Sequence, residues 1–212
     1  DMLTRGRNPL YRPGNFSLSF ERMRPRKGAW AWEFDAFAQS GGLAGNDKVG
    51  YGAAFEPTYY FSDALSAFAG VEYEYTPDWL VWQHDNLVGR FEEQSLEFNA
   101  GVDWSIGQRQ ELRVKLQAIG LDAQLAEAIE VQPDGRAVVV ADPVSDFSLR
   151  NLGFQVRYRY ILAPLSDLYV VYGRGGYVFD EFSVGPREQL VDSFSLRDSE
   201  QLLVKLSYRF EL

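Results

Sequence analysis

Apolar and polar residues alternate with a period of two along most of the chain. From 96 to 106, every even position is apolar and every odd position is polar or glycine. A strand places successive side chains on opposite faces, whereas a helix would mix these two sets. The same alternation recurs over 16–20, 30–36, 65–75, 112–118, 152–162 and 202–212. The pattern therefore predicts an all-β protein.

At least nine strands follow from this pattern, and two kinds of connection separate them. The strands lie at about 15–24, 29–39, 49–60, 65–82, 87–105, 111–122, 149–162, 168–179 and 200–210. Short turns at 24–28, 61–64, 107–110 and 164–167 alternate with longer or more polar connections at 40–48, 84–86, 122–148 and 180–199. Successive antiparallel strands return the chain to the same side at every second connection. The sequence thus predicts an antiparallel up-and-down β-barrel.

Two kinds of barrel share this period, because a soluble barrel turns its apolar face inward and a membrane barrel turns it toward lipid. The strands near 65–83 and 87–104 are longer than the five or six residues usual in soluble sheets. Many Trp and Tyr residues fall toward the predicted strand ends, where aromatic rings suit the membrane interface. These features favour a transmembrane β-barrel of a bacterial outer membrane. A soluble barrel that binds an apolar ligand is the alternative.

The end of the chain carries a further indication. The alternating residues from Leu202 to Phe210 resemble the terminal strand by which barrel-assembly machinery recognises outer-membrane proteins, although Glu211 and Leu212 follow the phenylalanine. If this last strand descends to the periplasm, the strand at 15–24 descends as well. Bacterial single-chain barrels have even strand numbers. Either residues 3–11 supply a tenth strand, or residues 15–212 are the C-terminal portion of a larger barrel and residues 1–14 an N-terminal segment; the second is favoured.

Three segments, at 77–82, 109–121 and 157–172, resemble the C-terminal part of a family of large bacterial outer-membrane proteins. Members of that family join a domain similar to the family 9 carbohydrate-binding modules to a β-barrel of uncharacterised function. The resemblance extends over most of residues 15–212. It implies an outer-membrane location and an upstream domain that this chain lacks. It supplies no catalytic residue, and it assigns sugar binding to no residue of this chain.

Composition and charge exclude several functions. The formal net charge is −9, which disfavours nucleic acid as a partner because phosphate binding needs clustered Lys and Arg. The chain has no Cys and a single His, so it offers neither a thiolate metal site nor a multi-histidine site. Asp134, Asp142 and Asp146 fit ordinary turns better than a calcium loop. We therefore expect no metal and no cofactor.

An enzyme remains a competing class. His84 lies beside Asp85 and is the only conventional general base, but a hydrolase would also need a serine placed by the fold. Glu72 and Glu74 could serve glycoside hydrolysis, yet carboxylates two residues apart are expected on any solvated strand face. We interpret His84 as part of a polar loop tip and predict a protein that is not an enzyme.

Charge segregates on the polar sides of the strands. The earlier strands carry an acidic set, here called the acidic wall, which comprises Glu33, Asp35, Glu72, Glu74, Glu97 and Asp103. The later strands carry a basic wall, which comprises Arg113, Lys115, Arg157, Arg159, Lys205 and Arg209. In a barrel these walls face one another across or around the lumen and create a transverse field.

The leading functional hypothesis is therefore a non-enzymatic outer-membrane barrel that acts as a pore, an uptake channel or a membrane anchor. Its main partner is the lipid bilayer, and a protein partner or upstream domain is possible. The alternatives are an outer-membrane enzyme with a site in the external loops near His84 and the soluble barrel described above.

Overall fold

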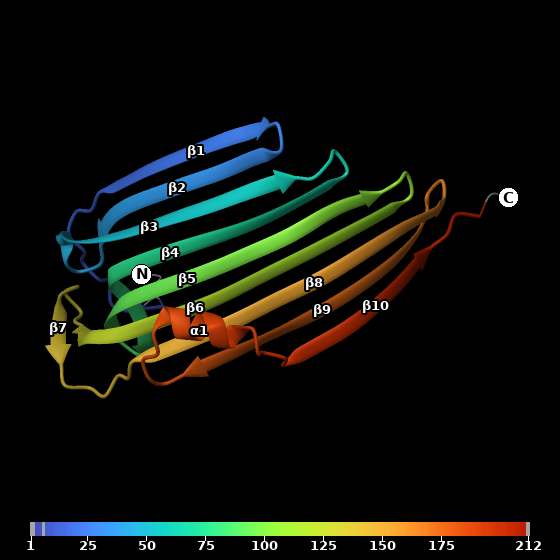
Figure 1. Cartoon of the computed structure of the whole chain (residues 1–212). Helices are drawn as coiled ribbons and strands as arrows, with labels where there is room; N and C mark the ends of the chain where they lie inside the picture. Colours follow the sequence, from blue (N-terminus) through green and yellow to red (C-terminus); the bar gives the residue numbers. More distant parts are fainter. Residues whose placement is uncertain (1–2, 6, 211–212) are drawn as a thin grey trace.

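The computed structural model describes residues 3–5 and 7–210 of the chain. Ten strands and one helix make up its regular structure (Figure 1). In chain order they are β1 (Ser17–Lys27), β2 (Trp30–Gly41), β3 (Gly45–Tyr60), β4 (Leu65–His84), β5 (Leu87–Ile106), β6 (Gln110–Val131), β7 (Ala137–Val140), β8 (Phe147–Ala163), β9 (Ser166–Asp180), α1 (Pro186–Ser193) and β10 (Ser199–Ser207). The prediction of an all-β protein is confirmed. No helix in the described part of the chain is long and apolar enough to cross a membrane.

The strands form one antiparallel sheet in the order β1-β2-β3-β4-β5-β6-β8-β9-β10, with β7 added beside the end of β6. Apart from the step over β7, every strand pairs with its neighbour in sequence, so the predicted up-and-down topology is confirmed. The sheet formed by the described residues is open and does not close into a barrel. Its two margins are β1 and β10 (Figure 1). Every residue of these two strands is exposed.

The disfavoured alternative of a tenth strand at 3–11 and the predicted end of the strand at 111–122 were both wrong. The described residues from Leu3 to Phe16 form no strand, so the tenth strand is not at 3–11; it is β7, inside the region predicted as a loop at 122–148. In that region β6 also continues to Val131. A bulge explains the error, because the pairing shifts where Arg90 and Phe91 oppose Glu127 and Leu125. The extra residue, Ala126, reverses the parity of the apolar pattern.

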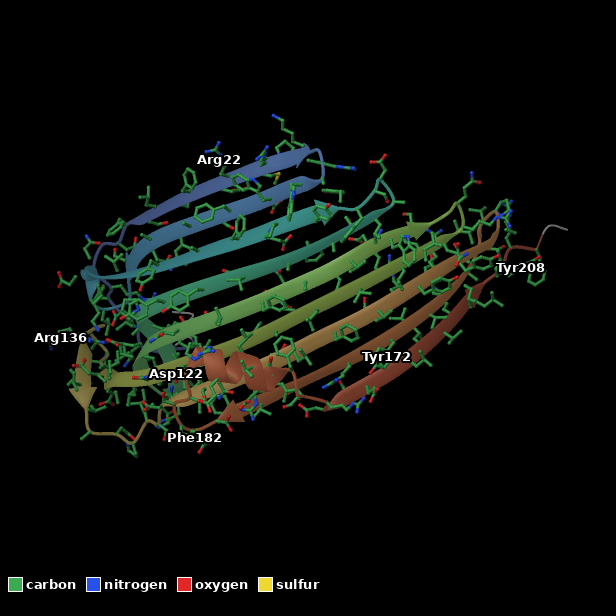
Figure 2. All side chains as sticks on the ribbon, in the orientation of Figure 1. Arg22, Asp122, Arg136, Tyr172, Phe182 and Tyr208 are labelled. Atoms are coloured by element: carbon green, nitrogen blue, oxygen red, sulfur yellow. The ribbon has the colours of Figure 1, made fainter. Side chains whose placement is uncertain are left out.

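The register gathers the alternating side chains onto two different faces. Val102 pairs with Val114, which pairs with Val156, and Phe98 pairs with Ala118. These residues belong to what we call the apolar face, which also carries Leu116, Phe154, Val204 and Leu206. Side chains project from both sides of a single layer (Figure 2). Much of the apolar face is open, as Val71 is 50% and Val204 60% exposed.

Buried apolar contacts concentrate at the end of the sheet away from the hairpin turns. Leu10 of the N-terminal segment packs against Val88, Ile129 and Val131. Leu196, just beyond α1, packs with Ala118 and Leu152 on the apolar face. Gly120 allows this close approach, because an added Cβ would lie 2.3 Å from the Pro186 carbonyl oxygen. The helix therefore covers only one end of the apolar face.

The hairpin turns step steadily along one end of the sheet (Figure 1). One row of paired residues runs from Trp30, the first residue of β2, to Tyr172, six residues after the start of β9. Relative to the turns, the row is therefore displaced along the strand direction by six residues, or roughly 20 Å. Over the same row, the six spacings between neighbouring strands from β2 to β9 add up to roughly 29 Å. If the turns lie in one plane, the strands are tilted by about 35° from the normal of that plane.

Candidate functional site

The face opposite the apolar face, called the polar face here, carries the charged residues that the sequence singled out. Asp35 pairs with Ala54, Ala54 with Glu72, and Glu72 with Glu97, so three carboxylates occupy one row across four strands. Glu33 lies two residues from Asp35, and Glu74 and Asp103 lie at even spacings from Glu72 and Glu97. The register therefore places the whole acidic wall on the polar face.

Glu56 also belongs to this cluster, although it is not among the residues predicted for the acidic wall. Glu56 pairs directly with Glu33 and joins the same hollow of about 170 Å³ as Asp35 and Glu72. The alternation of polar and apolar residues does not reveal the polar side of β3, because the preceding residues on that side are Gly50, Gly52 and Ala54. Only the cross-strand register with β2 reveals the position of Glu56.

Five residues of the basic wall share the polar face. Arg113 pairs with Arg157, Lys115 lies two residues from Arg113, and Arg159 pairs with Tyr169, which pairs with Lys205. Arg209 lies beyond the end of β10, where its backbone N–H donates to the Ser166 hydroxyl over 3.0 Å. The strand register therefore does not place the Arg209 side chain on this face.

The two walls adjoin within one sheet and meet between β5 and β6. The Arg113 guanidinium lies 3.3 Å from Asp103 and also contacts Glu111. Arg157 lies 3.7 Å from the same Glu111 carboxylate. Arg159 donates two hydrogen bonds to Asp167, at 3.1 and 3.2 Å. Three of the basic residues are thus paired with carboxylates.

Apart from Asp103, the acidic wall lacks such compensation. Among the described residues, none of the ion pairs within 4.0 Å involves Glu33, Asp35, Glu56, Glu72 or Glu74. Glu97 accepts a hydrogen bond from the Gln117 amide over 2.7 Å. Sequence reasoning overlooked Glu111 and Asp167, the acidic residues that neutralise the basic side. The polar face therefore presents an excess of negative charge between β2 and β5.

A second hollow of about 540 Å³ lies beside the acidic one, toward β8 and β9. Gly153 and Gly173 form part of its lining and leave room that larger side chains would fill. Lys115, Gln155 and Gln201 also line it. The charged residues in its lining, Lys115 and Arg174, are basic, in contrast to the acidic hollow at Glu33 and Glu72.

Near the end of the sheet opposite the turns, the polar face becomes aromatic. The Phe147 ring lies 5.1 Å from Phe91 and 5.3 Å from Phe179, and it also contacts Trp79. Glu93 is buried beside these rings and only 6% exposed. Burial raises the pKa of the Glu93 carboxyl, and the charge of Glu74 adds to the effect.

The other candidate chemical groups lie apart. His84 lies at the exposed tip between β4 and β5, where its Nδ1 is 3.6 Å from Asp85. No hydrogen bond among the described residues joins it to a serine. Asp134 bonds within its own turn, and hydrogen bonds from the backbone N–H and the guanidinium of Arg136 lower the pKa of its carboxyl. Asp146 accepts from the Leu125 backbone N–H. Within 3–5 and 7–210, no group of three or more His, Cys, Asp or Glu side chains is arranged to hold a metal ion.

Comparison of the chain with protein families, with curated proteins and with solved structures finds no match. The resemblance to the outer-membrane family therefore stays a prediction, which rests on the three segments at 77–82, 109–121 and 157–172.

Proposed function

We propose that this chain forms part of the wall of a transmembrane β-barrel in a bacterial outer membrane, where its polar face lines a lumen that conducts small polar solutes. One observation carries the proposal: an extended apolar face lies open on one side of a single sheet whose other side is charged. A soluble sheet buries its apolar face under a second layer. In a membrane barrel, lipid takes that place.

The aromatic residues support this orientation. Tyr51 and Tyr59 stand on the apolar face of β3, eight residues apart. The ring centroids of Tyr51 and Tyr75 lie 5.4 Å apart, and those of Tyr59 and Trp30 lie 4.8 Å apart. At a tilt of about 35°, eight residues span about 22 Å along the membrane normal, close to the apolar band of about 25 Å of known barrels. The two groups of rings thus fit the two interfaces of a bilayer.

The asymmetry of the connections supports the same orientation. The turns near Gly28, Gly107 and Leu165 are short. At the opposite end the connections at 42–44 and 85–86 are short as well, but β4, β5 and β6 extend past Tyr75, and the segments at 132–146 and 181–198 are long. Outer-membrane barrels have short periplasmic turns and longer external loops. We therefore place the turns in the periplasm and α1 at the outer side.

The charges favour cations as the solutes. Carboxylates without ion pairs occupy β2 to β5, whereas Arg113, Arg157 and Arg159 are each held by carboxylates. Rings of free carboxylates select for cations in membrane pores. This proposal of an excess of negative charge replaces the transverse field between two opposite walls that the sequence pattern predicts.

The absence of cysteine provides a direct test. Val102 and Asp103 are neighbours on opposite faces, so Val102→Cys and Asp103→Cys are matched variants. In membranes that contain the protein, a water-soluble maleimide should label Asp103→Cys and leave Val102→Cys unlabelled, because only the polar face meets water. Membrane flotation must accompany the labelling. Equal labelling of the two variants, or protein that stays in buffer without detergent, would overturn the proposal.

A further inference from the structure

The two margins of the sheet point in the same direction along the membrane normal. β1 runs toward the turn at Gly28, and β10 runs toward the same end, because its residues Ser199 to Ser207 pair antiparallel with Gly175 to Asp167 of β9. Nine strands lie on the path from β1 to β10 in the described residues. An odd number of antiparallel strands leaves both outermost strands parallel to each other. β1 and β10 therefore cannot pair antiparallel within one copy.

A second copy does not remove the difficulty. Copies inserted in one membrane have the same orientation, so each presents the same two descending margins. Any contact between β1 or β10 of one copy and β1 or β10 of another joins two parallel strands. Antiparallel closure between copies is therefore excluded for the same reason as closure within one copy.

The margins nevertheless require a partner in a membrane. β1 is 11 residues long and β10 is 9, and within the described part of the chain each has one row of backbone N–H and C=O groups without a neighbouring strand. On β10, Leu202, Val204 and Leu206 are more than half exposed, so this margin would face hydrocarbon. Open sheet edges do not occur in the apolar region of a bilayer, because each unpaired group costs several kcal/mol.

We infer that β1 and β10 are joined by an odd number of additional amphipathic strands that lie outside residues 17–207 and pair antiparallel with both margins. The first and last of these strands run away from the turns, opposite to β1 and β10. Like the rest of the wall, they carry apolar residues toward lipid and polar residues toward the lumen. This inference rests on the proposed function.

Photo-crosslinking in the membrane tests the inference. A benzophenone amino acid is placed singly at Leu18, Phe20 and Arg22 of β1 and at Leu202, Val204 and Leu206 of β10, in the protein as its host produces it. Mass spectrometry then locates the crosslinked residue. We expect peptides from outside 17–207, with the crosslinked position moving backward as the probe moves forward, which is the signature of antiparallel pairing.

Two results would overturn the inference. Crosslinks between β1 and β10, in one chain or between two copies, would mean that a parallel pair closes the barrel. Crosslinked positions that move forward with the probe would mean that the additional strands are parallel to the margin. A benzophenone at Val71, which is 50% exposed on the apolar face, is the matched control and should capture lipid only. Flotation of the same variants separates the two proposals, since protein that does not float contradicts the proposed function itself.

Discussion

On the polar face, two phenylalanine rings lie over glycines of the neighbouring strand. Phe37 lies over Gly52, and Phe68 lies over Gly101. A Cβ at Gly52 would be 2.5 Å from the Phe37 ring, and one at Gly101 would be 2.4 Å from the Phe68 ring. Such pairs let a large ring lie flat against the sheet. Because these rings lie flat, they project less from the polar face than upright side chains would.

Gly101→Ala should therefore destabilise the sheet. The new methyl group would meet the Phe68 ring and, at 2.8 Å, the Val114 carbonyl oxygen, so we expect a loss of about 1–3 kcal/mol in the free energy of unfolding. Urea unfolding in detergent micelles measures it. Gly153→Ala is the matched control, since a Cβ there meets nothing within 4 Å. Equal effects at both glycines would contradict this account.

Glu93 should make stability depend on pH, and its position beyond the Tyr75 ring puts it outside the proposed membrane span. Its pKa in the folded protein is raised above the ordinary 4.5. As the pH rises from about 4.5 toward the raised value, the unfolded chain loses this proton first, and the free energy of unfolding falls. Above the raised value the destabilisation is complete.

Glu93→Gln should remove this decrease and stabilise the protein at neutral pH. Urea midpoints between pH 4 and pH 9 measure the effect, and Glu130→Gln, which removes one exposed carboxylate, is the control. A parallel pH dependence in the wild type and in Glu93→Gln would refute the role of burial.

At the scale of elements, α1 is attached to the sheet by a buried polar side chain. The Gln189 amide donates to the Ser148 hydroxyl over 2.7 Å and to Asp180 over 3.2 Å, and its oxygen accepts from Arg150 over 2.7 Å. Gln189 is fully buried. Because a single residue connects to three others on β8 and β9, it fixes where the helix lies.

Gln189→Leu should loosen α1 selectively. The substitution leaves Arg150, Asp180 and Ser148 with fewer partners, and unsatisfied buried polar groups cost about 1–3 kcal/mol. Amide hydrogen exchange should become faster over 186–196 while β4 and β5 keep their protection. Glu188→Leu, at the neighbouring exposed position, is the control. Unchanged exchange in α1 would show that the apolar contact of Leu196 is sufficient.

Helix α1 was not predictable from the sequence, in contrast to the long strands. Long strands such as β5 were predictable, because one face of each strand is apolar and the period is uninterrupted from Leu96 to Ile106. The buried side of α1 carries the polar residues Gln189 and Ser193. The sequence therefore has no apolar stripe with a helical period from which this helix could be predicted. The bulge at Ala126 hid the end of β6 for a related reason, since it interrupts the period.

The charged face was predictable only in part. Alternation assigned the acidic and basic residues to one side of their strands, and the register agrees for all of them except Arg209. Pairing between charges depends on neighbours that are distant in sequence. Glu111 beside Arg157, and Glu56 beside Glu33, therefore became apparent only when the strands were aligned in space.

At the scale of the whole molecule, the excess of free carboxylates predicts the ion selectivity of the proposed barrel. Glu33→Gln combined with Glu72→Gln should reduce the preference for cations, measured as a shift of the reversal potential in planar bilayers under a salt gradient. Arg157→Gln combined with Arg159→Gln should instead increase this preference, because it removes two positive charges and leaves Asp167 without its guanidinium partner. Shifts of the reversal potential in the same direction in both double variants would contradict the proposed role of the charges.

The order of the strands also bears on how the molecule folds. From β1 to β6, each strand pairs with the one before it, so each step of growth closes a short loop and has a small entropic cost. Contacts of this kind give a low contact order, which favours rapid folding. One contact between residues that are far apart in the sequence is the hydrogen bond that the Asn8 amide donates to the Val131 carbonyl, and it lies at one end of the sheet. For the proposed barrel, the slowest step of maturation is then expected to be the final joining of the margins, long after the hairpins have formed.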